Sequence, residues 1–310
     1  MSNLLSQIVI NTRPVERAAP LTQHLQAAGM EVVEMPMLTL QLLERSAADM
    51  ALMRQWLAGE YQALVIVSPT AAASGLEIWQ TLKQQHAATS QDSQDSQDSQ
   101  DDNLSVSAAY RAPSHIIAVG TATAAVLQQA PVQIDYQVLQ PMIANNEGML
   151  AMPEIEGLQA GDKLLVWRGR GGRRLLVDTL QARGVHIDSI AWYERTLPDK
   201  AVLQYQAWLS TFMAQKPALE SLAVPPLSKP LPKPIVIISS GSAFENWATV
   251  VEQAQLLAPD LGIDNPLQLA DFGYVVLGER LATMVDAQQL EHYRVEDLAP
   301  QSILAAIHHG

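Results

Sequence analysis

Cysteine is absent from this chain of 310 residues. Its absence excludes disulfide bonds, thiol nucleophiles and thiolate metal sites. Long apolar runs are also missing, and none approaches the roughly 18 residues that a membrane-spanning helix needs. The first residues, MSNLLSQIVINTRP, contain no basic segment followed by an apolar stretch, so they lack the pattern of a signal peptide. We therefore expect a cytoplasmic protein that does not bind a membrane.

Lysine and arginine are scarce, since 19 of them face 32 acidic residues and the formal net charge is −13. This balance argues against nucleic-acid binding, which relies on neutralising many phosphates. Part of the negative charge is local, because residues 91–102, QDSQDSQDSQDD, contain five aspartates and no apolar residue. Such a segment cannot bury enough surface to offset its ordering entropy. We predict a disordered surface insert at about residues 88–108.

Positive charge is concentrated between residues 163 and 174, where five of twelve residues are basic and none is acidic. The apolar run 164–167 predicts a buried strand, and a helix is predicted from Leu175 to the closing Gly184. The glycine loop between them exposes N–H groups at the positive end of the helix dipole, which suits an anion. Its spacing fits neither a Walker A loop nor a dinucleotide fingerprint. The pattern favours a carboxylate or phosphate site, with a solvated arginine loop as the alternative.

Short apolar runs and helical periodicities alternate along the chain. Strands are predicted at residues 8–10, 32–35, 64–67, 115–119, 164–167, 185–193, 235–238 and 274–277. Helices are predicted between them, including one at residues 201–213, and the proline-rich residues 217–234 are predicted to form an exposed loop. This alternation is typical of parallel sheets with helices on both faces. The length suggests two domains.

The chain also repeats itself. A shift of 155 residues places Thr12 on Trp167 and Gly29 on Gly184, and VIVS at 65–68 resembles VIIS at 236–239. The order is A-B-A′-B′, which predicts two similar α/β domains but leaves open whether A pairs with B or with B′. Ligands of open α/β sheets bind at the carboxyl ends of the strands. With two such domains, we expect the site in the cleft between them.

Together, several segments resemble the uroporphyrinogen-III synthase family over nearly the whole chain. They are TRP at 12–14, VSPTAA at 67–72, AVGTATAAVL at 118–127, WRGRGGRRLL at 167–176, WYER at 192–195 and ISSGSA at 238–243. The sequence departs from the family pattern where Val67 and Ile238 replace a threonine that often precedes the turn serine. The last glycine turn, residues 278–281, also lacks the usual threonine.

The resemblance implies two flavodoxin-like domains, each a parallel sheet flanked by helices. One would comprise residues 1–37 and 196–310, and the other residues 40–192. The two chain crossings, near residues 36–40 and 192–198, would form an extended two-stranded hinge.

The family's activity is implied in the same way. Its members are lyases that cyclise hydroxymethylbilane, a linear tetrapyrrole polycarboxylate, to uroporphyrinogen III with loss of water and inversion of ring D. The resemblance implies a spirocyclic intermediate, no cofactor and no metal. It also implies a monomer that contacts the preceding pathway enzyme transiently. Two alternatives remain. One is a non-catalytic sensor or carrier of an anionic ligand. The other, a sugar-nucleotide transferase, is disfavoured because neither half has an acidic ribose-binding residue at convincing spacing.

The resemblance makes Tyr193 the catalytic candidate, assisting departure of the hydroxyl or orienting the cation. The alternative is a packed tyrosine whose hydroxyl bonds to the backbone. Turns with N–H and hydroxyl donors supply the expected substrate-binding residues, although Arg13 would equally serve to tie its own loop. These residues are Thr12, Arg13, Ser68, Pro69, Thr70, Gly120, Thr121, Thr123, Arg168, Gly169, Arg170, Gly172, Ser239, Ser240, Gly241 and Gly278.

Overall fold

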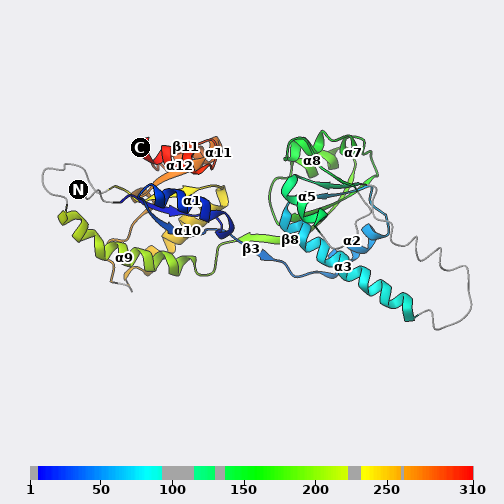
Figure 1. Cartoon of the computed structure of the whole chain (residues 1–310), viewed down its shortest axis with the longest axis horizontal. Coiled ribbons are helices and arrows are strands. Elements are labelled where there is room, and N and C mark those ends of the chain that lie inside the picture. The colour runs from blue at the N-terminus through cyan, green and yellow to red at the C-terminus, as the bar shows by residue number, and fades with distance from the viewer. Residues whose placement is uncertain (1–5, 93–114, 130–136, 223–231, 260–261, 310) are drawn as a thin grey trace, which may run out of the picture. The chain divides into compact units, whose positions relative to one another are not determined.

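The computed structural model describes residues 6–92, 115–129, 137–222, 232–259 and 262–309 (Figure 1). Contacts divide the chain into two units. Unit 1 comprises Met1–Thr39 and Thr196–Gly310, and unit 2 comprises Leu40–Arg195. Each unit contains a parallel sheet flanked by helices, which confirms the predicted fold class. In the part of the chain that the structure describes, no helix is long and apolar enough to cross a membrane.

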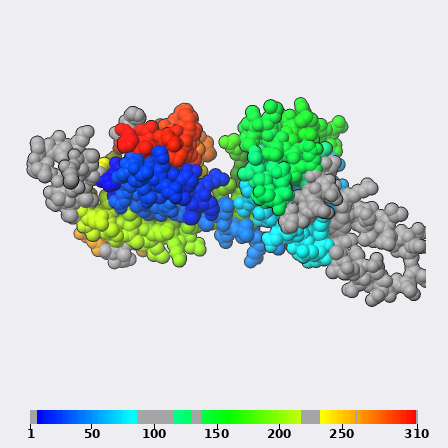
Figure 2. Space-filling view, viewed as in Figure 1, coloured from blue at the N-terminus to red at the C-terminus, as the bar shows by residue number. Residues whose placement is uncertain are grey.

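Unit 1 is built on a five-stranded sheet of order β2-β1-β9-β10-β11. The strands are β1 (Ile8–Asn11), β2 (Glu31–Glu34), β9 (Ile235–Ile238), β10 (Gly273–Leu277) and β11 (His292–Val295). The apolar side chains of α1 (Val15–Ala27) and α12 (Pro300–His309) cover one face of the sheet, and these two helices lie side by side (Figure 2). The other face is covered by α9 (Ala201–Leu222), α10 (Gly241–Leu257) and α11 (Gly278–Asp286), with the short 3₁₀ helix η2 (Leu269–Asp271) before β10.

Unit 2 repeats this order as β8-β7-β4-β5-β6, and β3 lies beside β8. The strands are β3 (Thr39–Leu42), β4 (Ala63–Ile66), β5 (His115–Ala118), β6 (Val138–Leu139), β7 (Lys163–Gly169) and β8 (His186–Thr196). One face packs against α2 (Ala47–Leu57), α3 (Pro69–Asp92) and α5 (Thr121–Gln128). The other packs against α6 (Asn146–Leu150), α7 (Pro153–Glu156) and α8 (Leu175–Ala182).

The central strands β4 and β9 are apolar throughout because both faces of each sheet are covered, as parallel sheets require. In β7, Leu165 and Trp167 point into the core under α2, α3 and α5, whereas Leu164 and Val166 point into the core under α8. Trp167 is fully buried and packs edge-on against the indole ring of Trp56, with centroids 5.3 Å apart. This bulky side chain fixes the first turns of α3. A Cβ on Gly75 would come within 2.2 Å of the Trp167 ring.

The chain repeat is visible in the strand registers. Ile8 pairs with Glu31 between β1 and β2, and Lys163 pairs with His186 between β7 and β8, so both partners are displaced by the predicted 155 residues. Strand β1 pairs with β9, and β4 pairs with β7. The A segment, which contains β1, therefore shares a sheet with the B′ segment, which contains β9. The B segment, which contains β4, shares the other sheet with the A′ segment, which contains β7.

The second half of the repeat needs a correction of one residue. The sequence match sets Ser68 against Ser239, but the structural counterpart of Ser68 is Ser240. Both side chains cap a helix by accepting a hydrogen bond from the N–H three residues on, at Ala71 and Ala243 respectively. Runs of β-branched residues look alike when they slip by one position, whereas the cap geometry and the strand registers fix the match.

Two helices extend further than predicted. Helix α3 continues to Asp92, so the start of the predicted insert was wrong, and its residues 93–108 lie outside the described part of the chain. Helix α9 continues through Pro217 to Leu222, where an exposed loop was predicted. Proline removes one donor and disfavours the helix, but its neighbours here, alanine, glutamine, lysine, leucine and glutamate, are good helix formers. Of the predicted loop, residues 223–231 lie outside the described part.

Candidate functional site

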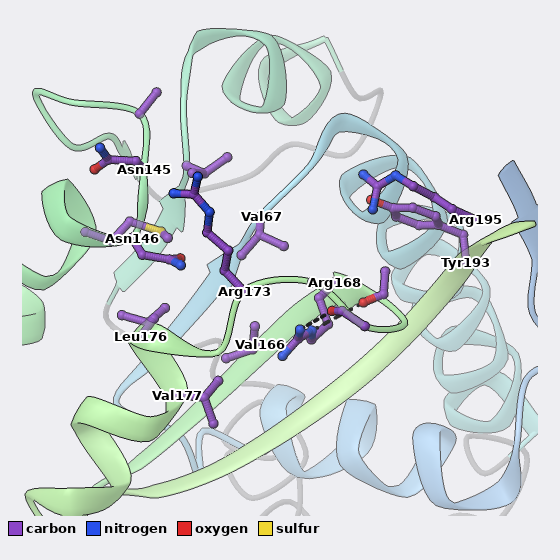
Figure 3. Close-up of a pocket in the computed structure, with 16 residues that line it drawn as sticks. Val67, Asn145, Asn146, Val166, Arg168, Arg173, Leu176, Val177, Tyr193 and Arg195 are labelled. Carbon is purple, nitrogen blue, oxygen red and sulfur yellow. Dashed lines mark hydrogen bonds between the residues drawn. The ribbon is translucent and has the colours of Figure 1, made fainter. Parts of the chain in front are cut away.

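In the unit 2 sheet, the neighbouring strands β7 and β4 are followed by helices on opposite faces, which makes this position a topological switch point. Strand β7 leads to α8 on one face and β4 leads to α3 on the other, so the two following loops diverge. Crevices at such switch points bind ligands in open α/β sheets. A cavity of about 470 Å³ lies here, with walls that include Val67 after β4 and Val166 in β7 (Figure 3).

The lining of this cavity is basic. Arg168, Arg173 and Arg195 contribute guanidinium groups, and none of the lining residues is acidic. Asn145 and Asn146, at the start of α6, also line the cavity. In a chain of net charge −13, this concentration of cations creates a local environment suited to an anion with several charged groups.

Arg168 is tied to its own loop. Its Nε donates to the Gly169 carbonyl at 3.3 Å, and its Nη2 donates to the Gly171 carbonyl. The loop can curl around this side chain because Gly171 and Gly172 adopt φ of 76° and 86°, a region that favours glycine. Arg170 does not line the cavity, and its guanidinium pairs with the Glu194 carboxylate at 2.8 Å.

Tyr193 lies against the cavity in a tightly defined position. Strands β7 and β8 shift register between Arg168 and Gly169, which brings Gly169 opposite Tyr193. A Cβ on Gly169 would lie 2.6 Å from Cζ of Tyr193, so only glycine leaves room for the ring. The ring is 2% exposed, and its hydroxyl donates to Oγ of Ser68 at 3.0 Å. The hydroxyl therefore bonds to a side chain, and not to the backbone as the packing alternative supposed.

Ser68 joins this tyrosine to a helix N-terminus. Its Oγ accepts from the N–H of Ala71 at 3.1 Å, which makes Ser68 the cap of α3, and Pro69 and Thr70 follow in the first turn. On the neighbouring strand end, Gly120 precedes Thr121, the first residue of α5. Gly120 and Thr121 lie on the same edge of the sheet as Ser68, whereas Thr123 is 2% exposed and faces the core side of α5.

The unit 1 candidates gather at the corresponding edge of their own sheet. Thr12 is fully buried, and its hydroxyl donates to the Ile237 carbonyl, which ties β1 to β9. Partial burial and the charge of Arg17 lower the pKa of the Arg13 guanidinium. Ser240 caps α10 and follows Ser239 at the end of β9. The two glycine candidates of this unit begin helices, Gly241 in α10 and Gly278, with φ of 70°, in α11.

Sequence reasoning missed the four polar side chains Arg173, Arg195, Asn145 and Asn146 of the lining. Arg173 lies in the basic stretch but was not distinguished from its neighbours. Asn145 had a usable signal, because asparagine is a preferred helix cap and its side chain accepts from the N–H of Gly148. Arg195 belongs to the WYER segment. Within the described residues, no group of three metal-ligating side chains comes together.

Comparisons with known proteins identify the family of this chain. Residues 19–302 match the family model described as Uroporphyrinogen-III synthase HemD. A stretch of 79 residues is 37% identical to uroporphyrinogen-III synthase from Escherichia coli (strain K12), covering 25% of this chain and 30% of that protein. A stretch of 50 residues is 42% identical to uroporphyrinogen-III synthase from Salmonella typhimurium (strain LT2), covering 16% and 20%. Both stretches span less than a third of the relatives' lengths.

The fold is also shared with a solved structure. A mutant uroporphyrinogen III synthase from the extremely thermophilic bacterium Thermus thermophilus is similar over 98% of this chain and 100% of its own, with a TM-score of 0.51. Its sequence is 11% identical, so this likeness concerns the fold alone. The family model, in contrast, covers most of the chain and confirms the resemblance carried by the sequence motifs. The chain belongs to the uroporphyrinogen-III synthase family.

Proposed function

We propose that this protein converts hydroxymethylbilane to uroporphyrinogen III, as a cyclising lyase of porphyrin and haem biosynthesis. The observation that carries the proposal is the cavity at the switch point of unit 2, where three arginines and no carboxylate lie beside Tyr193. Hydroxymethylbilane bears an acetate and a propionate on each of its four rings, so it is strongly anionic. Guanidinium groups bind carboxylates through paired, charge-assisted hydrogen bonds.

The proposed reaction begins with loss of water from the hydroxymethyl carbon of ring A. The resulting azafulvenium cation forms a bond to the substituted α-carbon of ring D, which gives a spirocyclic pyrrolenine. The original bond between this α-carbon and the bridge carbon that links rings C and D then breaks. The bridge carbon forms a new bond to the free α-carbon of ring D. Loss of a proton there restores the pyrrole. One proton is taken up by the departing hydroxyl and one is released, so no oxidant or reductant is needed.

Tyr193 and Ser68 are suited to the first step. The Tyr193 hydroxyl is bonded to Ser68 Oγ, which is itself held by the N–H of Ala71 at the start of α3. If the two hydroxyl hydrogens rotate, Ser68 donates to Tyr193 and Tyr193 donates to the departing oxygen. Such assistance typically contributes about 10²-fold to a rate. Most of the catalysis would come from holding one geometry of the bilane, so the protein needs neither cofactor nor metal.

The test is the isomer composition of the product. Purified protein is added to freshly prepared hydroxymethylbilane, and uroporphyrinogens I and III are oxidised and separated. The bilane closes spontaneously to isomer I, so the expected result is rapid formation of isomer III above that background. Bilane that closes only to isomer I, at the rate without protein, would refute the proposal. Binding of the bilane without turnover would favour the sensor or carrier.

A further inference from the structure

We infer that the cavity of unit 2 is a self-contained site for one pyrrole ring carrying two carboxylates, and that Arg173 is its principal anion-binding residue. The inference rests on the proposed function for the identity of the ligand, because a pyrrole with acetate and propionate arms is the repeating unit of the bilane. It goes further in assigning one ring to one cavity and in distinguishing among the arginines.

The three arginines differ in the contacts that already hold their guanidinium groups. Arg168 donates to the carbonyls of Gly169 and Gly171, so part of its guanidinium holds the loop. Arg195 also makes no hydrogen bond or ion pair within the described residues, but its guanidinium carbon lies over the ring of Tyr193, 5.5 Å from the ring centroid. Within the described residues, Arg173 makes no hydrogen bond or ion pair, and its side chain is exposed. Its planar set of five donors is therefore available to a carboxylate.

The surroundings of Arg173 complete the anion site. Figure 3 shows its side chain reaching from the glycine loop toward the side of the cavity where Asn145 and Asn146 lie. The Oδ1 atom of Asn145 accepts from Gly148 N–H at 2.7 Å, which leaves the NH₂ group of that amide to donate. A guanidinium and an amide contributed to one cavity by different elements can hold two carboxylates of one small ligand.

The size and the walls of the cavity limit the ligand to a fragment of the bilane. Pockets of about 300–1,000 Å³ enclose drug-sized ligands, and this one measures about 470 Å³. A tetrapyrrole with eight carboxylate arms is too large for that volume, whereas a single substituted pyrrole fits. Val67, Val119 and Val166 give the apolar surface that the flat ring requires.

The apolar surface continues outside the cavity. Met142 and Ile143, which directly precede the lining residues Ala144 and Asn145, are 105% and 63% exposed, and Leu175 at the start of α8 is 43% exposed. Exposed apolar side chains beside a basic cavity can contact the next ring of a longer ligand. The remainder of the bilane would thus leave the cavity across this surface.

The experiment measures binding of a monopyrrole that bears one acetate and one propionate, by titration calorimetry at low ionic strength. We expect saturable binding to the wild type. Since a charge-assisted hydrogen bond corresponds to about tenfold or more in affinity, Arg173→Ala should weaken binding roughly tenfold. Arg183→Ala is the matched control, because Arg183 is exposed at the opposite end of α8 and does not line the cavity. The same ligand with one carboxylate converted to an amide should bind about as weakly as the diacid binds to Arg173→Ala.

The outcomes separate the inference from the proposed function. Equal losses in Arg173→Ala and Arg183→Ala would show a general charge effect and overturn the assignment of Arg173. Formation of isomer III by a protein that does not bind the monopyrrole diacid would overturn the one-ring site and leave the activity standing. Binding that depends on Arg173, without any isomer III from the bilane, would overturn the proposed activity and leave the site standing.

Discussion

Gly169→Ala tests whether the position of Tyr193 matters, because this substitution adds one methyl group at the place where the tyrosine ring packs. The new Cβ would lie 2.6 Å from Cζ, 2.7 Å from Cε2 and 3.0 Å from the hydroxyl oxygen of Tyr193. Carbon atoms in contact prefer about 3.5–4.0 Å, so the ring must retreat by about 1 Å. The Tyr193–Ser68 hydrogen bond, now 3.0 Å, would then lengthen beyond hydrogen-bonding distance.

The expected magnitude follows from these contacts. Overpacking a core position costs about 1–3 kcal/mol, and the weakened hydrogen bond adds about 1 kcal/mol. For a unit of this size, a loss of 1 kcal/mol lowers the melting temperature by about 2–4 °C. The total of about 2–4 kcal/mol therefore predicts a fall of about 4–16 °C. If the Tyr193 hydroxyl assists departure of water, kcat should also fall by up to about 10²-fold.

Gly273→Ala is the control for this experiment. Gly273 is a buried glycine at the start of β10 in unit 1, and a Cβ there would meet Ile235 and Tyr293 at 3.8 and 3.9 Å, which is ordinary contact. Its melting temperature and kcat should stay close to those of the wild type. The assays are thermal unfolding by circular dichroism and formation of isomer III. A Gly169→Ala protein with wild-type stability and kcat would refute the argued contact between Gly169 and Tyr193.

Three further changes probe other contacts. Tyr193→Phe should lower kcat by about 10²-fold and still give mainly isomer III. Formation of isomer I by the variant enzyme would mean that Tyr193 controls the inversion of ring D. A wild-type rate would mean that the tyrosine only packs. Arg168→Ala should raise KM and accelerate amide hydrogen exchange around Gly171, since that side chain holds the loop; unchanged exchange would contradict this role. Thr12→Val removes the donor to the buried Ile237 carbonyl and should destabilise the protein by about 1–3 kcal/mol in denaturant titrations without changing KM. A raised KM with unchanged stability would instead make Thr12 a substrate ligand.

Much of the fold could be predicted because it depends on patterns that are local in sequence. Fully apolar runs of four residues, followed by turns with serine, threonine or glycine, identify strands buried on both faces. The 155-residue repeat carries over directly into the registers of β1 with β2 and β7 with β8. The elements without a predicted counterpart are mostly short or at sheet edges, such as β6 and β11. Helix α2 was missed although Ser46 and Asp49 form a capping box at its start.

The allocation of the arginines could not be predicted, because it depends on the path of one loop. Four arginines between residues 168 and 174 look equivalent in the sequence. The positive φ angles of Gly171 and Gly172 turn the chain back over Arg168, and the salt bridge to Glu194 holds Arg170 outside the cavity lining. Neither the path of this loop nor the salt bridge of Arg170 can be recognised from composition or from the spacing of residues. The sequence therefore indicated an anion site but not which guanidinium is available in it.

The two units show how a change in one loop accompanies a cavity in a shared fold. Under the 155-residue shift, α1 and α8 end at equivalent residues, Ala27 and Ala182, but α1 begins five positions earlier than α8 does. In unit 1, the five residues from Val15 onward form the first turns of the helix. In unit 2, their equivalents from Arg170 onward form the glycine loop, and the cavity lies beside it. Pro14 starts the helix in one unit, and its equivalent Gly169 admits the Tyr193 ring in the other. Because these residues are not helical in unit 2, they give up helical hydrogen bonds, and Gly171, Gly172 and Arg173 line the cavity instead.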